Sequence, residues 1–138
     1  MNFSIEMETG TGKTYTYLRS VFELNKKYGF KKFLIVVPSV AIREGVLKTI
    51  EMTKEHFKEH FENVPFNHFV YDGGKLSNVR SFAVSNEISI MIINIDSFNK
   101  DSNIIRRRLN SSSGSNIFLI FFTNFGTYTN FKIMSYLD

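Results

Sequence analysis

A glycine-rich loop near the start of the sequence restricts the possible folds more than any other feature. The segment METGTGKT, residues 7–14, follows a short strand-like run at residues 2–7 and leads into an amphipathic stretch at residues 15–28. This order of strand, glycine loop and helix is the setting that a phosphate-binding loop requires. Its two glycines allow successive backbone N–H groups to point at one anion, and the first helical turn adds more of them. The sequence therefore predicts a P-loop domain.

The loop supplies the candidate ligands of a nucleotide. Lys13 can reach the β- and γ-phosphates, and the Thr14 hydroxyl can ligate Mg²⁺. The pattern G-x-x-x-x-G-K-[ST] is met except at its first position, where the unbranched Met7 stands in place of glycine and can bend away from the phosphates. With ATP and Mg²⁺ as the expected ligands, the candidate residues are Thr9, Gly10, Thr11, Gly12, Lys13 and Thr14.

Apolar runs and amphipathic stretches alternate along the following part of the chain. Residues 32–37, 66–71 and 88–95 have the length and apolar character of buried strands, and helices are expected at 41–61 and from a Ser77 cap to about residue 86. Alternating strands and helices predict an α/β fold, a parallel doubly wound sheet with right-handed crossovers. The strand at residues 2–7 is expected inside this sheet, which suggests that sequence before it is missing.

Composition excludes several classes of protein. The sequence has no cysteine, which rules out disulfide scaffolds and thiolate zinc sites. It shows no secretory leader, and no apolar run approaches the ~18 residues of a membrane span, so a soluble, cytoplasmic protein without a membrane partner is expected. The net charge of +4 suits a partner rich in phosphates but is too small to identify one.

Three motifs in sequence order closely resemble the motor region of type III restriction enzymes, the Res subunit. METGTGKT resembles helicase motif I, VVPSVAIREGV (residues 36–46) resembles motif Ia, and IINIDSFNK (residues 92–100) resembles the next motif that contacts nucleic acid. The resemblance covers roughly residues 2–101, and the family belongs to the DEAD/DEAH-type helicases and translocases of superfamily 2. It implies a RecA-like parallel sheet with helices on both faces, incomplete in this chain.

In this family, two RecA-like domains clamp and hydrolyse ATP while moving along DNA, a separate nuclease domain cuts, and a modification (methyltransferase) subunit supplies the recognition site. The resemblance therefore implies DNA as a partner of this chain. Ser39 and Arg43 offer suitable donors for a phosphodiester backbone. Carried over residue by residue, the candidate DNA-binding positions are Pro38, Ser39, Arg43, Asp96, Ser97 and Asn99.

The character of the sequence changes after residue 101. A basic run at residues 106–108 precedes the low-complexity segment SSSGS at 111–115, and the last 37 residues contain one acidic residue, Asp138. Two segments are therefore expected. Residues 1–101 form a partial first motor domain, and residues 102–138 form a divergent tail that is out of frame or poorly ordered.

The sequence departs from the family pattern where hydrolysis is concerned. The resemblance predicts an Asp-Glu pair, motif II, at the end of an apolar strand, because these carboxylates hold Mg²⁺ and orient the attacking water. The strand-like run at residues 117–122 is followed by Thr123 and Asn124 instead. The second motor domain, its arginine finger and the nuclease are missing as well. We therefore expect no catalytic residue in this chain, and nucleotide binding without turnover.

Two alternatives remain open at this stage. Asp96 follows an apolar strand, as a Walker B aspartate does, so the chain also fits a small stand-alone P-loop NTPase or kinase. A non-catalytic remnant that binds nucleotide or DNA is the other alternative. The match of the whole IINIDSFNK segment favours a fragment of a Res subunit.

Overall fold

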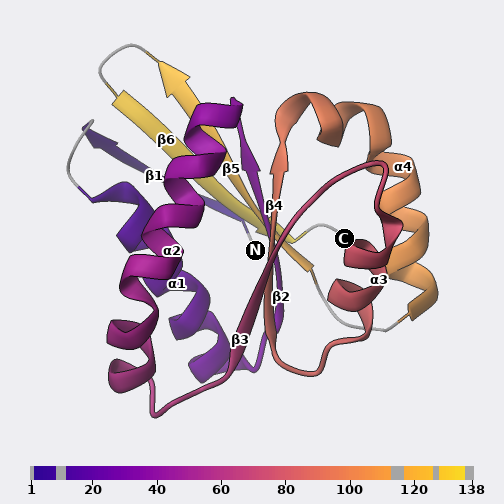
Figure 1. The fold of residues 1–138 in the computed structure, drawn as a ribbon. Coiled ribbons are helices and arrows are strands. Elements are labelled where there is room, and N and C mark those ends of the chain that lie inside the picture. Colours follow the sequence, from indigo (N-terminus) through magenta and orange to yellow (C-terminus); the bar gives the residue numbers. More distant parts are fainter. Residues whose placement is uncertain (1, 9–11, 113–116, 126–127, 136–138) are drawn as a thin grey trace.

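Strands and helices alternate along the chain in the computed structural model, which describes residues 2–8, 12–112, 117–125 and 128–135 (Figure 1). The elements are β1 (Asn2–Glu8), α1 (Lys13–Tyr28), β2 (Lys32–Val37), α2 (Val40–His60), β3 (Phe66–Val70), α3 (Leu76–Val84), β4 (Ile88–Asn94), α4 (Ile95–Ser112), β5 (Ile117–Phe125) and β6 (Tyr128–Ser135). Within these described residues, no helix is long and apolar enough to cross a membrane.

The strands form one sheet in the order β1-β6-β5-β2-β4-β3. The four strands β5, β2, β4 and β3 pair in parallel, whereas β6 is antiparallel to both β5 and β1. The predicted α/β fold with a parallel sheet is therefore confirmed for its central part. The strand KFLIVV at residues 32–37 is buried along its whole length, as expected for a parallel strand covered on both faces.

The predicted place of the first strand is wrong. β1 lies at the edge of the sheet, and within the described strands it pairs with β6 alone. Its sequence NFSIEME alternates polar and apolar residues, and β6 does so from Asn130 to Ile133. Phe3 and Ile5 are the register partners of Ile133 and Phe131, so apolar positions face apolar positions across the pair. This alternation is typical of an antiparallel strand with one covered face rather than of a buried parallel strand.

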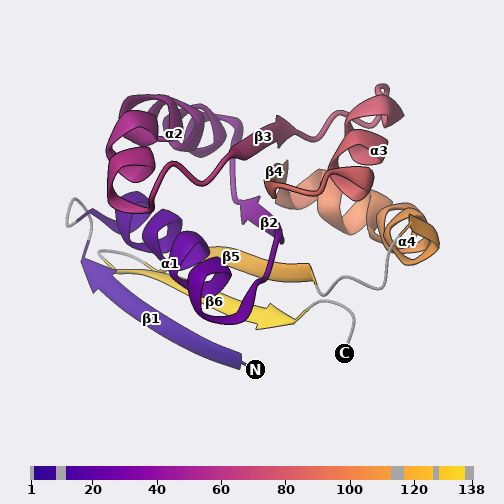
Figure 2. The same ribbon diagram turned by 90° about the horizontal axis from the view of Figure 1, so that it is seen from below.

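Helices cover the two faces of the sheet in pairs (Figure 2). On one face, α1 and α2 pack against alternate residues of β2, namely Phe33, Ile35 and Val37, in one core cluster. On the other face, α3 and α4 pack against Leu34 and Val36 in a second cluster. Successive side chains of a strand point to opposite faces of the sheet, so the buried strand β2 contributes residues to both clusters.

Several predicted boundaries differ from the structure. Ser77 does not cap α3: it is the second residue of that helix, and the N-cap position belongs to Lys75, without a side-chain cap. β4 ends at Asn94, and the residues after it begin α4. β5 continues through the Thr-Asn pair at 123–124 to Phe125, so the strand does not end at residue 122. The predicted segment boundary after residue 101 stays a prediction, although α4 runs without a break from 95 to 112.

Candidate functional site

The carboxyl ends of the parallel strands bring two of the predicted segments together. Val37 and Asn94, the last residues of β2 and β4, are register partners. The segment that begins at Pro38 and the segment that begins at Ile95 therefore leave the sheet side by side. β1 runs in the same direction as β5, because each is antiparallel to β6. β1 therefore ends at the same edge of the sheet, with β6 and β5 between β1 and β2 (Figure 1).

The described end of the glycine loop has the geometry of an anion site. Gly12 is the N-cap of α1 with φ 83°, a left-handed conformation that favours glycine. No side chain caps this helix and its first turn holds no acidic residue. An anion is the ligand that the first-turn N–H groups of such a helix start bind. The predicted ligands Thr9, Gly10 and Thr11 lie outside the described residues.

Thr14 lies between the loop and the core. It is half-buried in the first turn of α1, three residues before Tyr17 on the same helix. Tyr17 is completely buried. Burial raises the pKa of the Tyr17 hydroxyl well above its usual value. The Tyr17 hydroxyl is therefore neutral at any physiological pH.

The start of α2 holds the motif Ia candidates. Ser39 is the N-cap of α2, and its Oγ accepts a hydrogen bond from the Ile42 amide at 3.3 Å. Arg43 pairs through Nη2 with Glu44 Oε1 at 3.2 Å. The Glu44 side chain is 61% exposed, and an exposed ion pair of this kind contributes little free energy. A phosphate can therefore compete with Glu44 for the guanidinium group. Pro38 precedes both residues at the end of β2.

The third candidate segment lies in the first turns of α4. Asp96 is exposed and is the acidic residue of the first helical turn, a position that the helix dipole favours. β4 ends at Asn94, one residue before the expected end of the strand, so Asp96 lies in the first turn of α4 rather than directly after a strand. Ser97 and Asn99 follow on the helix and can donate hydrogen bonds to a phosphate, whereas the Asp96 carboxylate repels one.

Two long-range side-chain contacts join the elements at this edge of the sheet. Local sequence patterns could not have indicated them. The Tyr71 hydroxyl, just after β3, donates to Asp101 Oδ2 on α4 at 2.8 Å. At the start of α1, the Tyr15 hydroxyl is 2.9 Å from His56 Nε2 on α2. The first contact fixes α4 against the end of β3, and the second fixes the start of α1 against α2. Among the described residues, no cluster of three or more histidines or acidic residues could hold a metal ion.

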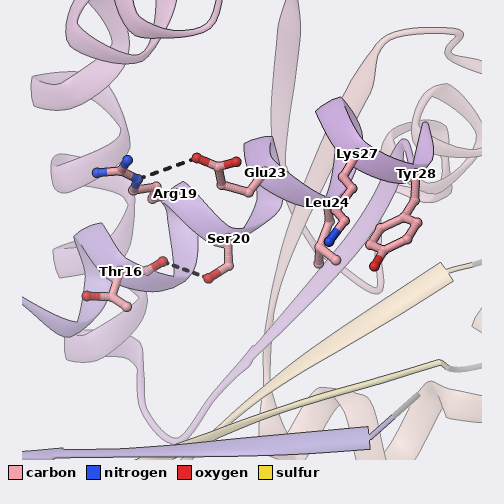
Figure 3. Close-up of a pocket in the computed structure, with 7 residues that line it drawn as sticks. All are labelled: Thr16, Arg19, Ser20, Glu23, Leu24, Lys27 and Tyr28. Atoms are coloured by element: carbon pink, nitrogen blue, oxygen red, sulfur yellow. Dashed lines mark hydrogen bonds and ion pairs between the residues drawn. The ribbon is translucent and has the colours of Figure 1, made fainter.

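A pocket of about 440 Å³ runs along α1 from Thr16 to Tyr28 (Figure 3). Arg19 and Glu23 form an ion pair at 3.7 Å on its rim. The described lining residues all belong to α1: Thr16, Arg19, Ser20, Glu23, Leu24, Lys27 and Tyr28. None of these described lining residues is a site residue predicted from the sequence.

Comparison with known proteins places this arrangement in a family. A family model described as "Type III restriction enzyme, res subunit" matches residues 1–122. The match extends past residue 101 and includes the whole of α4. It ends inside β5, so β6 lies beyond it.

Relatives with the same description are similar over a shorter stretch. The EcoPI Res subunit of Escherichia phage P1 is 47% identical over 60 residues, 42% of this chain. The StyLTI Res subunit of Salmonella typhimurium is 48% identical over 64 residues, 45% of this chain. The EcoP15I Res subunit of Escherichia coli is 45% identical over 60 residues. Each match covers 6% of the relative's length, so the chain corresponds to a small part of these proteins.

Proposed function

The chain belongs to the type III restriction enzyme Res subunit family, and from this premise we propose that it binds Mg²⁺–ATP at the start of α1 and contacts DNA along the edge where β2 and β4 end. The observation that carries the proposal is the start of α1. Gly12 adopts a left-handed conformation there, no side chain caps the helix, and Lys13 follows directly. This combination suits a triphosphate better than any ligand without negative charge.

In the proposed complex, different residues of the chain bind the phosphates and the metal ion. The backbone of the loop and the Lys13 ammonium hold the phosphates, and the Thr14 hydroxyl is the protein ligand of the metal. A bound Mg²⁺ would neutralise part of the charge of the phosphates. The half-buried position of Thr14 suits this role, because the residue borders the loop on one side and the core on the other.

The proposed DNA contacts lie along the same edge of the sheet. Arg43 provides the cation for a phosphate, and Ser39, Ser97 and Asn99 provide neutral donors. Few phosphates are neutralised by such a set, so we expect weak, salt-sensitive binding without preference for one DNA sequence. In the intact family we propose a modification subunit as the protein partner, as the restriction-modification names of the relatives suggest.

Calorimetric titration with Mg²⁺–ATP tests the nucleotide proposal. Replacing Lys13 with Ala removes a charge-assisted contact worth about 1.5–3 kcal/mol, so the affinity should fall roughly tenfold to a hundredfold. Lys26→Ala is the matched control, because Lys26 is exposed near the other end of the same helix. Equal affinities for the wild type and Lys13→Ala would reject the site, and an equal loss in both variants would point to non-specific attraction by charge.

A further inference from the structure

Two exposed histidines lie one turn apart on α2, close to its C-terminal end. His56 and His60 have ring centroids 6.0 Å apart, and the planes of the two rings differ by 13°. The residue after each of them, Phe57 and Phe61, is buried in the core cluster, with exposed fractions of 2% and 5%. These two phenylalanines fix the orientation of the helix about its axis. The two histidines are therefore held together on one side of a packed helix, at its surface.

The separation of the two rings suits chelation of a metal ion. Side chains four positions apart on a helix share one face and can meet. A transition metal lies about 2.1 Å from each imidazole nitrogen, so two rings on neighbouring coordination positions have centroids roughly 5 Å apart. The observed distance of 6.0 Å is close to this value, and rotation about the side-chain bonds can close the difference. No change of the backbone is required.

A hydroxyl group occupies one nitrogen of His56. Tyr15, at the start of α1, places its hydroxyl 2.9 Å from His56 Nε2. A tyrosine hydroxyl can accept a hydrogen bond as well as donate one, so Nε2–H can donate to it while Nδ1 keeps its lone pair. Metal-bound histidines commonly have this arrangement, in which the second ring nitrogen donates to a neighbouring oxygen. The contact with Tyr15 therefore leaves His56 with one nitrogen that can bind a metal ion.

The charges around the histidine pair favour a cation. Residues 51–62 contain four glutamates but two lysines. One of these lysines, Lys58, is paired with Glu55 at 3.2 Å. His60 is also the last residue of α2, where the helix dipole is negative and stabilises a nearby positive charge. The local net charge and the helix dipole therefore both attract a divalent cation to this end of α2.

We propose that His56 and His60 form a surface site for a divalent ion of the late first-row transition metals, namely Cu²⁺, Ni²⁺ or Zn²⁺. Imidazole is a good ligand for these ions, and Cu²⁺ should bind most tightly among them. In the part of the chain that the structure describes, no group of three or more histidine, cysteine or acidic side chains could hold a metal ion, so the pair provides two ligands and water completes the coordination. The site does not depend on nucleotide binding, and Mg²⁺ does not suit it because Mg²⁺ prefers oxygen ligands.

Calorimetric titration of the tag-free chain with NiCl₂, without nucleotide, tests this site. The wild type should bind one Ni²⁺ per chain, and an excess of Mg²⁺ should leave the affinity unchanged. His56→Gln and His60→Gln should each bind Ni²⁺ roughly a hundredfold more weakly, because a second ligand on the same helix no longer closes the chelate. His68→Gln is the matched control, because His68 is the third histidine of the sequence and lies on β3. It should bind Ni²⁺ as the wild type does.

Thermal unfolding gives an independent measurement of the same site. Both histidines are exposed, so the glutamine variants keep the packing of α2. Ni²⁺ should raise the unfolding midpoint of the wild type and of His68→Gln, because it binds the folded chain, and it should leave the midpoints of the other two variants unchanged. A wild-type chain that binds no Ni²⁺, or variants of His56 and His60 that bind it as tightly as the wild type, would overturn the inference. An equal loss of affinity in His68→Gln would also overturn it, because the metal would then be bound elsewhere.

Discussion

At the scale of single residues, Lys32 is the most deeply enclosed charged side chain in the described part of the chain. It is 3% exposed at the start of β2, and its Nζ donates hydrogen bonds to the carbonyl oxygens of Phe82 and Ser85 at the end of α3. Burial, together with a smaller effect of the neighbouring Lys31 charge, lowers the pKa of Lys32 to about 8. Lys32 thus links β2 to α3 while its positive charge is disfavoured by its surroundings.

This lysine predicts a rise in stability at alkaline pH. Between pH 8 and pH 10.5 the unfolded chain keeps a proton on Lys32 that the folded chain has lost, so the free energy of unfolding should increase with pH across this window. The increase has an upper limit of roughly 3 kcal/mol, from a shift of about 2.5 pKa units. Urea unfolding at pH 7.5 and pH 10 should show a larger increase for the wild type than for Lys32→Met. The exposed Lys48→Met is the control; identical pH dependence in all three proteins would show that Lys32 titrates normally.

At the scale of elements, Ser39 caps the start of α2 and is also a proposed DNA contact. Substitutions of Ser39 can separate these two roles. Ser39→Ala removes the cap on the Ile42 amide and should cost about 1 kcal/mol in urea unfolding. Ser39→Asp keeps a good N-cap but adds a negative charge beside Arg43. It should retain wild-type stability and lose affinity for labelled DNA, measured by fluorescence anisotropy at low salt. A stable Ser39→Asp chain that binds DNA as well as the wild type would move the DNA contacts away from the start of α2.

Sequence patterns predicted the elements that are formed by local periodicity. β2 was found at its observed bounds, because a continuous apolar run is closed by Pro38, and α1 and α2 were found within two residues of their ends. The position of β1 could not be found in this way, since strand order depends on pairing with β6 more than 120 residues away. α4 was missed because its first residues continue the apolar run of β4 and its remainder is mostly polar.

The candidate site was predictable to a similar extent. The order of glycine, lysine and threonine in the loop indicates a phosphate site by itself, and the Gly12 conformation suits that prediction. The packing behind the site was not predictable. The bond of Tyr71 to Asp101 joins residues thirty positions apart, and the pairing of Arg43 with Glu44 depends on side-chain geometry that the sequence leaves open. The roles of the predicted site residues remain predictions.

At the scale of the whole molecule, the sheet includes residues that lie beyond the family match. The match ends at residue 122, and β6 at residues 128–135 joins β1 to the rest of the sheet. β1, which precedes the predicted nucleotide loop, therefore pairs with a strand that lies beyond the family match. The aligned segments cover 6% of the length of each relative, so the proposed roles concern a small part of proteins of that size.

Steady-state phosphate release by the purified 138-residue chain, with and without DNA, separates a part of a Res motor from a self-sufficient NTPase. We predict no DNA-stimulated release, even where calorimetry shows ATP binding. The β5 positions 123 and 124 hold no carboxylate, and an arginine finger supplied by a partner domain is worth about 10³–10⁵ in rate. Release that DNA stimulates and that Lys13→Ala abolishes would contradict this account. So would release that Asp96→Asn abolishes, which would instead assign the chain to stand-alone P-loop enzymes.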